Sequence, residues 1–501
     1  MTSKRIFIRN GILLGAVGVL SRTVGLFFGA YVTRTVGAAG MGMYTLLMTV
    51  FGFAVTFATS GVGLTVTRLA ADAMGDGDPA RMSRVLRSCI FYAAGFGLFG
   101  TFLLLCLARP LSVLTVGDGS GVPALCVLAL SLCPIALSSV LSGYFVSLRH
   151  VGKNALTQIF TQGAKILVTV LFLPKAAVSG AASSCLFLSA VSAGSDTVCL
   201  LLLFLLFCSE KREPAGEGSE MRSVFGMAIP LAVSAYIRQA LITVEHILIP
   251  KRLRLHGATP EESLASYGVL QGMALPILLY PMAPLTSFSG LLVPEFAECR
   301  SSGRQDRMSR AASLAVSRTP IYGITLSAIT WPFSSEHRYT VYRSYEAGKL
   351  IAALAPVVPI MYLDHVTDAM LKGIGEQVYS MWVNISDAAL SVLLVFFLLP
   401  EFGIMGYVGA ILGMEAYNFV LSYARLKKRV SFRVPLSFAV VLPALCAAAS
   451  AWISGRLFGF SMAEATPFRL ISEMLFAVCL FLFFFTAAKN LLFKNKSGTF
   501  V

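Results

Sequence analysis

Two arginines lie near the middle of long apolar runs, far from the polar segments that flank them. Arg22 stands in LLGAVGVLSRTVGLFFG and Arg238 in IPLAVSAYIRQALITVEHILIP. A charge inside an apolar segment is costly unless it faces a partner or a water-filled cavity, so such residues mark candidate functional positions. A guanidinium group binds phosphate through paired hydrogen bonds and keeps its proton. The two residues predict a binding site for a phosphate-bearing anion; a structural ion pair with Glu245 or an aspartate is the alternative.

The stretch VPIMYLDHVTDAMLKGIGEQ carries two carboxyl groups inside another apolar segment. Asp364 and Asp368 are four residues apart, which places them on one face of a helix. Asp387 and Glu415 follow in later apolar segments and are candidate neighbours. Such carboxylates can bind a sodium ion, carry a proton or pair with a cation. Asp364, expected one turn deeper in the membrane, is the stronger candidate for ion coupling, whereas Asp368 is also compatible with a solvated helix end.

Four further ionisable side chains lie within apolar runs. Glu245 and His246 follow Arg238 by about two helical turns, so Glu245 is expected near the same helix face. They are candidates for cation binding or a proton relay, because imidazole titrates near neutral pH. The alternative is a pair of satisfied polar groups near the outer end of the helix. Lys165 and Asp196 are candidates for a salt bridge within the first half of the chain.

The sequence predicts neither a cofactor nor a metal site. The ten cysteines include no CxxC pair, and most of them lie in apolar runs, where a small buried hydrophobe is the ordinary role. The phosphate-binding motif GxxxxGK[ST] is missing, so we expect no built-in ATPase. Transport would then draw on an ion gradient, the membrane potential or a substrate gradient. We therefore expect a transporter and not an enzyme.

The elements that must position these residues are membrane helices. The chain has 501 residues, of which 56% are hydrophobic and 13% are charged, whereas soluble proteins carry about 25% charged residues. Apolar runs long enough to cross a hydrocarbon core of roughly 30 Å recur from end to end. They predict an all-α polytopic membrane protein with about 14 transmembrane helices. The ninth predicted span, 311–333, is the least regular because it contains Arg318 and Pro320.

The charge distribution predicts the orientation of the chain. The formal net charge is +15, and lysine and arginine gather in the loops on the side that holds both predicted termini. Basic residues are enriched in cytoplasmic loops, so both termini are expected in the cytoplasm. The same rule explains the positive charge without a nucleic-acid partner. The lipid bilayer is the expected partner, and the oligomeric state does not follow from the sequence.

An internal repeat divides the predicted spans. The tetrapeptide RMSR at 81–84 recurs at 307–310, and the same separation of 226 residues pairs Gly42 with Gly268 and LPKAAVSG with LPEFGIMG. Each copy holds six spans, an even number, so the copies share one orientation, as in the parallel halves of some transporters. Two parallel six-helix lobes around a central cleft predict alternating access. The expected segments are 1–208 (N-lobe), 209–222 (cytoplasmic linker), 223–428 (C-lobe) and 429–501 (two C-terminal helices and a cytoplasmic tail).

Four stretches carry a family resemblance: GILLGAVGVLSRTVGLFFGAYVTRTVGAAGMGMY, TSGVGLTVTRLAAD, SGLLVPEFAE and LKGIGEQVYSMWVNISDAALSVLLVFFLLPEFGIMGY. They resemble the multidrug/oligosaccharidyl-lipid/polysaccharide exporter superfamily, and within it the branch of stage V sporulation protein B and the lipid II flippases. The resemblance implies a multi-pass protein of the bacterial cytoplasmic membrane. It implies flipping of an undecaprenyl-pyrophosphate-linked sugar in cell-envelope or spore-cortex synthesis.

The resemblance also implies roles for individual residues. Lipid II flippases use cavity arginines, and Ser21-Arg22 followed by Thr-Val-Gly matches one such position. A further family arginine in the eighth span has no counterpart in YGVLQGMALP, and Arg238 is the candidate to replace it.

Three functions fit these residues. A flippase for a lipid-linked anionic sugar would use Arg22 and Arg238. A cation-coupled drug or small-metabolite antiporter of the same superfamily would use Glu245, Asp364 and Asp368 with Na⁺ or H⁺. A scaffold for envelope synthases would need none of these intramembrane charges, which therefore favour the two transporters.

Overall fold

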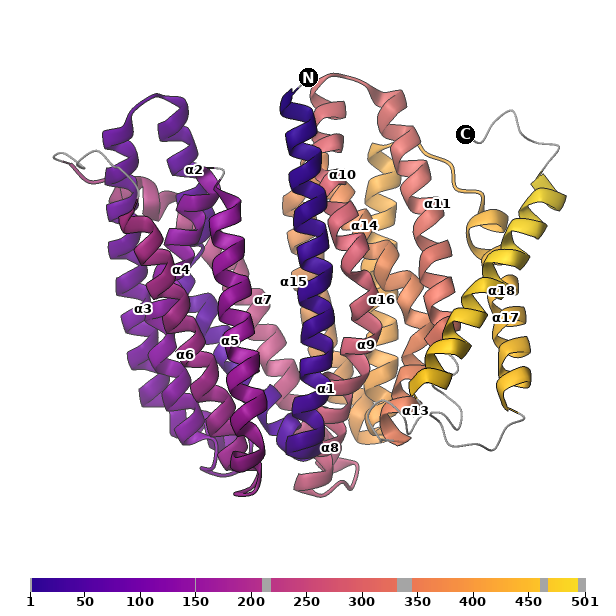
Figure 1. Ribbon diagram of the computed structural model, residues 1–501, viewed down its shortest axis with the longest axis horizontal. Helices are drawn as coiled ribbons and strands as arrows, with labels where there is room; N and C mark the ends of the chain where they lie inside the picture. The colour runs from indigo at the N-terminus through magenta and orange to yellow at the C-terminus, as the bar shows by residue number, and fades with distance from the viewer. Residues whose placement is uncertain (1, 149, 210–217, 331–344, 460–466, 494–501) are drawn as a thin grey trace. The chain divides into compact units, whose positions relative to one another are not determined.

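The protein is built from long helices (Figure 1). Within the described ranges there is no strand, which confirms the all-α fold class. Eleven helices there are long and apolar enough to cross a membrane; the expected number of fourteen stays a prediction. The side chains of residues 2–23 lie outside the description. The computed structural model describes residues 2–148, 150–209, 218–330, 345–459 and 467–493.

The first eight helices include the predicted N-lobe. They are α1 (Thr2–Thr59), α2 (Val62–Gly75), α3 (Pro79–Thr115), α4 (Val122–Ser147), α5 (Val151–Ala177), α6 (Ala181–Cys208), α7 (Met221–Leu255) and α8 (Pro260–Val269). The remaining elements are η1 (Leu270–Ala274), α9 (Leu275–Leu279), η2 (Tyr280–Met282), α10 (Ala283–Ser301), α11 (Gln305–Thr330), α13 (Tyr345–Leu354), η5 (Ala355–Val357), α14 (Val358–Gly373), α15 (Gln377–Phe402), α16 (Ile404–Arg429), η6 (Ser437–Val441), α17 (Leu442–Gly459) and α18 (Pro467–Phe493).

Glycines interrupt the first long helical stretch at two points. Gly37 has φ 83° and interrupts the helical backbone of α1. Gly61 has φ 71° and separates α1 from α2. A residue without Cβ adopts this left-handed region at no steric cost, so the chain turns there without strain.

The chain forms two compact units, Tyr31–Gly268 and a second one made of Met1–Ala30 with Val269–Val501. In the first unit α4 packs against α2, α3 and α6, and α5 packs against α6. The apolar residues of α4 fill the core, with Leu125, Leu128 and Leu132 fully buried. These two units differ in their bounds from the lobes 1–208 and 223–428 that the sequence repeat predicts, and the two lobes stay a prediction.

Glycine allows close helix approach at two places in the first unit. A Cβ on Gly143 of α4 would overlap Val66 and lie 2.7 Å from the carbonyl oxygen of Gly63 in α2. A Cβ on Gly42 of α1 would overlap the backbone of Leu264 in α8, and one on Gly268 would overlap the backbone near Gly42 itself. The two glycines paired by the internal repeat therefore lie against each other.

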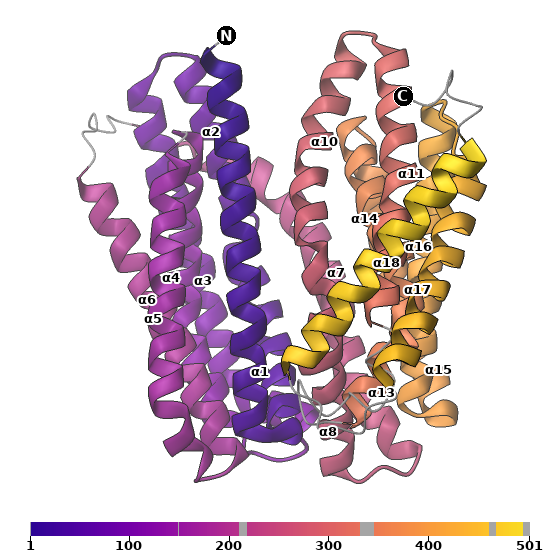
Figure 2. The ribbon, with the colours of Figure 1, turned by 45° about the vertical axis from the view of Figure 1, so that its right-hand side comes forward.

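In the second unit α14 lies among α10, α11 and α16, and α15 packs against α16. Figure 2 shows α10, α11 and α14 running alongside one another. Phe296 of α10 is fully buried where Gly373 of α14 approaches it. The C-terminal helices α17 and α18 pack together through a separate small core that includes Cys446 and Phe481 and also touches α11.

The predicted eighth span is interrupted near its three prolines. Pro276, Pro281 and Pro284 lie in or beside a π-helical turn, a short α-helix and a 3₁₀ turn that separate α8 from α10. Proline lacks the donor that a regular helix needs, so the backbone changes its hydrogen-bond pattern at these points. Pro260–Ser301 is therefore a broken span rather than one straight helix.

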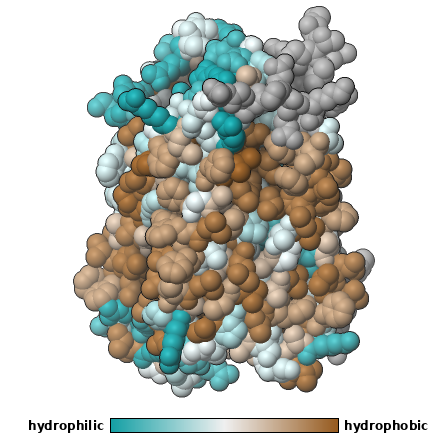
Figure 3. All heavy atoms as spheres, turned by 90° about the vertical axis from the view of Figure 1, so that its left-hand side faces the viewer, coloured by the Kyte–Doolittle hydropathy of each residue, from teal (hydrophilic) through white to brown (hydrophobic). Residues whose placement is uncertain are grey.

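One face of the molecule carries a continuous apolar band between two hydrophilic ends (Figure 3). Exposed phenylalanines of α3 such as Phe91, Phe99 and Phe102 are typical of a surface that contacts lipid chains.

Candidate functional site

Arg238 lies at the midpoint of α7, about 25 Å from either end at 1.5 Å per residue. Ala228 and Ala232 of the same helix are buried, and α7 packs on α2 and α3, with Ala228 close to Gly61. The Arg238 side chain is exposed, and no residue of the described part pairs with it. The ion pair with Glu245 considered from the sequence is not formed. A guanidinium group at mid-depth is thus free to contact a ligand.

Arg22, the other predicted phosphate ligand, lies on α1 in a stretch whose side chains are outside the described residues. Its backbone belongs to the second compact unit, whereas Arg238 belongs to the first. The two arginines thus come from different units, and their joint action stays a prediction.

Glu245 and His246 lie beside the buried hydroxyl of Tyr267. His246 Nδ1 lies 2.6 Å from the hydroxyl of Tyr267, a residue of α8 that is fully buried. The Glu245 side chain is only 6% exposed and interacts electrostatically with Tyr267. The three residues form one polar group between α7 and α8, and the role of Glu245 and His246 in ion binding stays a prediction.

Lys165 of α5 and Asp196 of α6 interact electrostatically across the α5–α6 contact. Ser131 of α4 hydrogen-bonds to Asp196. The two charges therefore attract each other inside the first unit, but the predicted salt bridge is not formed as a direct ion pair among the described contacts.

A group of three carboxyls, which we call the acidic cluster, occupies the second unit. Asp364 of α14, Asp387 of α15 and Glu415 of α16 interact electrostatically with one another. Ser422 hydrogen-bonds to Asp364, whose Oδ1 atom is buried and has no hydrogen-bond partner in the described part of the chain. Among the described residues, no group of three or more His, Cys, Asp or Glu side chains is arranged to hold a metal ion. Uptake of a proton by one of the three would reduce their mutual repulsion.

Asp368 has a different environment from Asp364. It lies one turn nearer the end of α14, where its Oδ2 pairs with Lys372 Nζ at 2.5 Å. The Ser380 hydroxyl donates to its Oδ1. Asp368 also repels Asp364 electrostatically, so it lies at the edge of the acidic cluster, with Lys372 offsetting its charge.

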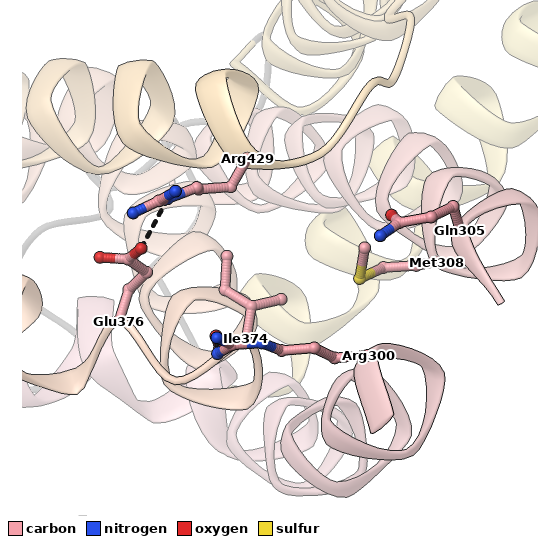
Figure 4. A pocket seen from close by; sticks show the side chains of 6 residues that line it. All are labelled: Arg300, Gln305, Met308, Ile374, Glu376 and Arg429. Atoms are coloured by element: carbon pink, nitrogen blue, oxygen red, sulfur yellow. Dashed lines mark hydrogen bonds and ion pairs between the residues drawn. The ribbon is translucent and has the colours of Figure 1, made fainter. Parts of the chain in front are cut away.

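A small pocket of about 180 Å³ lies where α10 and α16 end and α11 begins (Figure 4). Glu376, in the turn between α14 and α15, accepts hydrogen bonds from Arg425 Nη2 at 2.7 Å and Nε at 3.1 Å, and its other oxygen pairs with Arg429 Nε at 2.6 Å. Arg300 donates to the carbonyl oxygen of Ile374 in the same turn. The hydrogen bond from Arg425 is the main reason that the pKa of Glu376 lies below its usual value. We call this arrangement the Glu376 clamp.

Sequence reasoning missed the Glu376 clamp. Its glutamate lies in LKGIGEQ, which reads as a turn, and its arginines lie in the basic end of α16, which reads as a cytoplasmic loop. The only available signal was an acidic residue in a turn and a basic run 49 residues later.

The comparisons with known proteins agree with this fold. A sequence profile of the family described as polysaccharide biosynthesis protein matches residues 7–299. The chain belongs to this family. Stage V sporulation protein B of Bacillus subtilis (strain 168) is 24% identical over 460 residues, which is 88% of this chain and 88% of that relative. The family match contains Arg22, Arg238, Glu245 and His246, whereas the acidic cluster lies beyond it.

The fold of this chain is similar to those of solved transporter structures. Lipid II flippase MurJ in an inward closed conformation matches with a TM-score of 0.72 at 13% identity, over 97% of this chain and 100% of that one. A MATE multidrug resistance transporter of the MOP superfamily in an inward-facing conformation matches with a TM-score of 0.66 at 14% identity, over 82% and 98%. The fold is that of these polytopic membrane transporters, in agreement with the resemblance seen in the sequence.

Proposed function

We propose that the protein flips an undecaprenyl-pyrophosphate-linked oligosaccharide or peptidoglycan precursor across the bacterial cytoplasmic membrane by alternating access. The step would serve cell-envelope or spore-cortex polysaccharide synthesis. The observation that carries the proposal is the unpaired, exposed guanidinium of Arg238 at the midpoint of a membrane helix, in a polysaccharide biosynthesis protein. Arg22 and Arg238 bind the pyrophosphate, because guanidinium groups match phosphate oxygens in geometry and charge. The lipid chain stays in the bilayer.

The acidic cluster couples this movement to an ion. Asp364, Asp387 and Glu415 can share one proton, which changes their mutual repulsion and hence the packing of α14, α15 and α16. The unpartnered Oδ1 of Asp364 supports this role. The protein is then a transporter without an enzymatic site, with both termini in the cytoplasm and two six-span lobes at 1–208 and 223–428.

A flipping assay in proteoliposomes tests the proposal. Lipid II and an undecaprenyl-pyrophosphate-linked oligosaccharide are the two probes, and each is assayed with and without a proton or sodium gradient. Arg22→Ala and Arg238→Ala should each reduce flipping severely, whereas a variant of the exposed pair Glu298–Arg304, such as Glu298→Gln, should flip normally. If flipping of both probes persists in Arg22→Ala and in Arg238→Ala, the pyrophosphate site is wrong.

The second candidate is a cation-coupled drug or small-metabolite antiporter of the same superfamily, favoured by the acidic cluster. Drug efflux that is lost in Asp364→Asn and unchanged in both arginine variants would support it over the flippase.

A further inference from the structure

A cavity of about 400 Å³ lies between α10 and α11 in the second unit. It is lined mainly by apolar side chains, among them Leu285 and Phe288 of α10 and Leu314 of α11. Arg318 is the one charged residue among the residues that line it. The cavity thus combines a hydrocarbon-like wall with a single positive charge.

Arg318 lies within helix α11, the predicted ninth span, rather than at its end. It is about midway along the 26 residues of α11, roughly 20 Å from either end. One turn further, the Tyr322 hydroxyl donates to the carbonyl oxygen of Pro281 at 2.7 Å, in the middle of the broken span Pro260–Ser301. Gly323 packs on Pro359 of α14. These contacts place Tyr322 and Gly323 level with the middle of the two neighbouring spans, and Arg318 about one helical turn, roughly 6 Å, from that level.

No group in the described part of the chain neutralises the charge of Arg318. The Arg318 side chain is exposed, and within the described residues it has neither an ion pair nor a hydrogen bond. By contrast, Arg425 and Arg429, at the end of α16, are both held by Glu376. An intramembrane arginine without a counter-charge is costly, so the cavity is suited to an anion that arrives with its own apolar chain.

We propose that the cavity between α10 and α11 binds the phosphate group of an anionic isoprenoid lipid, with Arg318 on the phosphate and the chain on the apolar wall. This inference rests on the proposed flippase function and adds a contact site in the second unit. The position of Arg318 along the helix favours a lipid that is crossing the membrane over a resident phospholipid. Phosphates of resident phospholipids stay at the membrane surface, whereas the phosphate of a lipid in transit passes mid-depth. The ninth span therefore carries a charge because it contacts the transported lipid.

Equilibrium binding to the full chain in nanodiscs tests the site without requiring transport. The probes are undecaprenyl phosphate, undecaprenyl pyrophosphate and phosphatidylglycerol, each with a fluorescent label. Arg318→Gln should weaken binding of both undecaprenyl probes about tenfold or more, because charge-assisted hydrogen bonds to phosphate are lost. Arg318→Lys should retain part of the affinity. Arg310→Gln is the matched control, since Arg310 is an exposed arginine two turns earlier on the same helix.

A second variant keeps the test decisive if Arg318→Gln does not fold. Ala311→Trp fills the cavity without changing its charge and should also weaken binding of the undecaprenyl probes. Wild-type affinity in both Arg318→Gln and Ala311→Trp would overturn the site. Equal loss of phosphatidylglycerol binding would overturn the selection of a lipid in transit. If flipping fails for every lipid-linked sugar while Arg318-dependent binding remains, the proposed function is wrong and the binding site stands.

Discussion

The Glu376 clamp gives a prediction whose size follows from the contacts. Glu376→Gln keeps the shape of the side chain and one acceptor oxygen but removes the charge that holds Arg425 and Arg429. The Glu376 side chain is 15% exposed, that of Arg425 27% and that of Arg429 52%. A hydrogen bond to a charged group contributes about 1.5–3 kcal/mol when buried, and an exposed ion pair about 0.2–1 kcal/mol. The partly buried bond to Arg425 and the exposed one to Arg429 together suggest a loss of about 2 kcal/mol.

The measurement is hydrogen exchange of the backbone amides in the turn between α14 and α15, corrected for intrinsic exchange rates. A loss of about 2 kcal/mol raises the population of the locally open turn roughly thirtyfold. Glu298→Gln is the control, because it removes the same charge from a pair with Arg304 in which both side chains are more exposed. Its effect at its own helix end should stay below about fivefold.

The pH dependence of the clamp has a defined sign. The pKa of Glu376 is lowered in the folded protein, so the stabilisation is complete above the unfolded pKa of about 4.3 and is lost as pH falls through the folded value. The difference between wild type and Glu376→Gln should therefore be constant from pH 8 to pH 5 and shrink below pH 4. Exchange in Glu376→Gln that matches wild type at pH 7, or a difference that does not shrink in acid, would refute the reasoning.

Three other predictions address the sites and the packing. Arg238→Lys should retain more flipping than Arg238→Ala but less than wild type, because an ammonium binds phosphate as a point charge without the paired geometry; initial flipping rates check this. Asp364→Asn should abolish the dependence of flipping on an ion gradient, whereas Asp368→Asn, which removes a half-exposed pair, should change it little; rates with and without the gradient decide. Gly143→Leu should destabilise the first unit by about 3 kcal/mol or more through overlap with α2, whereas Gly95→Leu, on an open surface of α3, should be nearly neutral; denaturant midpoints in detergent compare them.

The sequence predicts the helices well because their signals are local. Apolar length indicates the spans, and Pro276, Pro281 and Pro284 indicate where the eighth span changes its hydrogen-bond pattern. The intramembrane position of Arg238 follows from hydropathy alone. These properties depend on residues within one or two turns of one another, so no tertiary information is needed.

The sites were predictable only in part, because they depend on contacts between distant helices. The spacing of Asp364 and Asp368 indicated one shared face, and the two carboxyls do interact electrostatically. Only the packed structure shows that Asp364 also meets Asp387 and Glu415, whereas Asp368 pairs with Lys372. Arg318 made the ninth span look irregular in the sequence. Its cavity became visible only once α10 was placed beside α11.

The contact between Gly42 and Gly268 has a mechanical consequence. Both positions present bare backbone to the partner helix, so no side chain from either one interlocks with the other. Interdigitated side chains resist a change in crossing angle because they must separate before the helices can turn. At this crossing the distance between α1 and α8 is therefore set by backbone atoms alone, and a methyl group at either glycine would force the two helices apart.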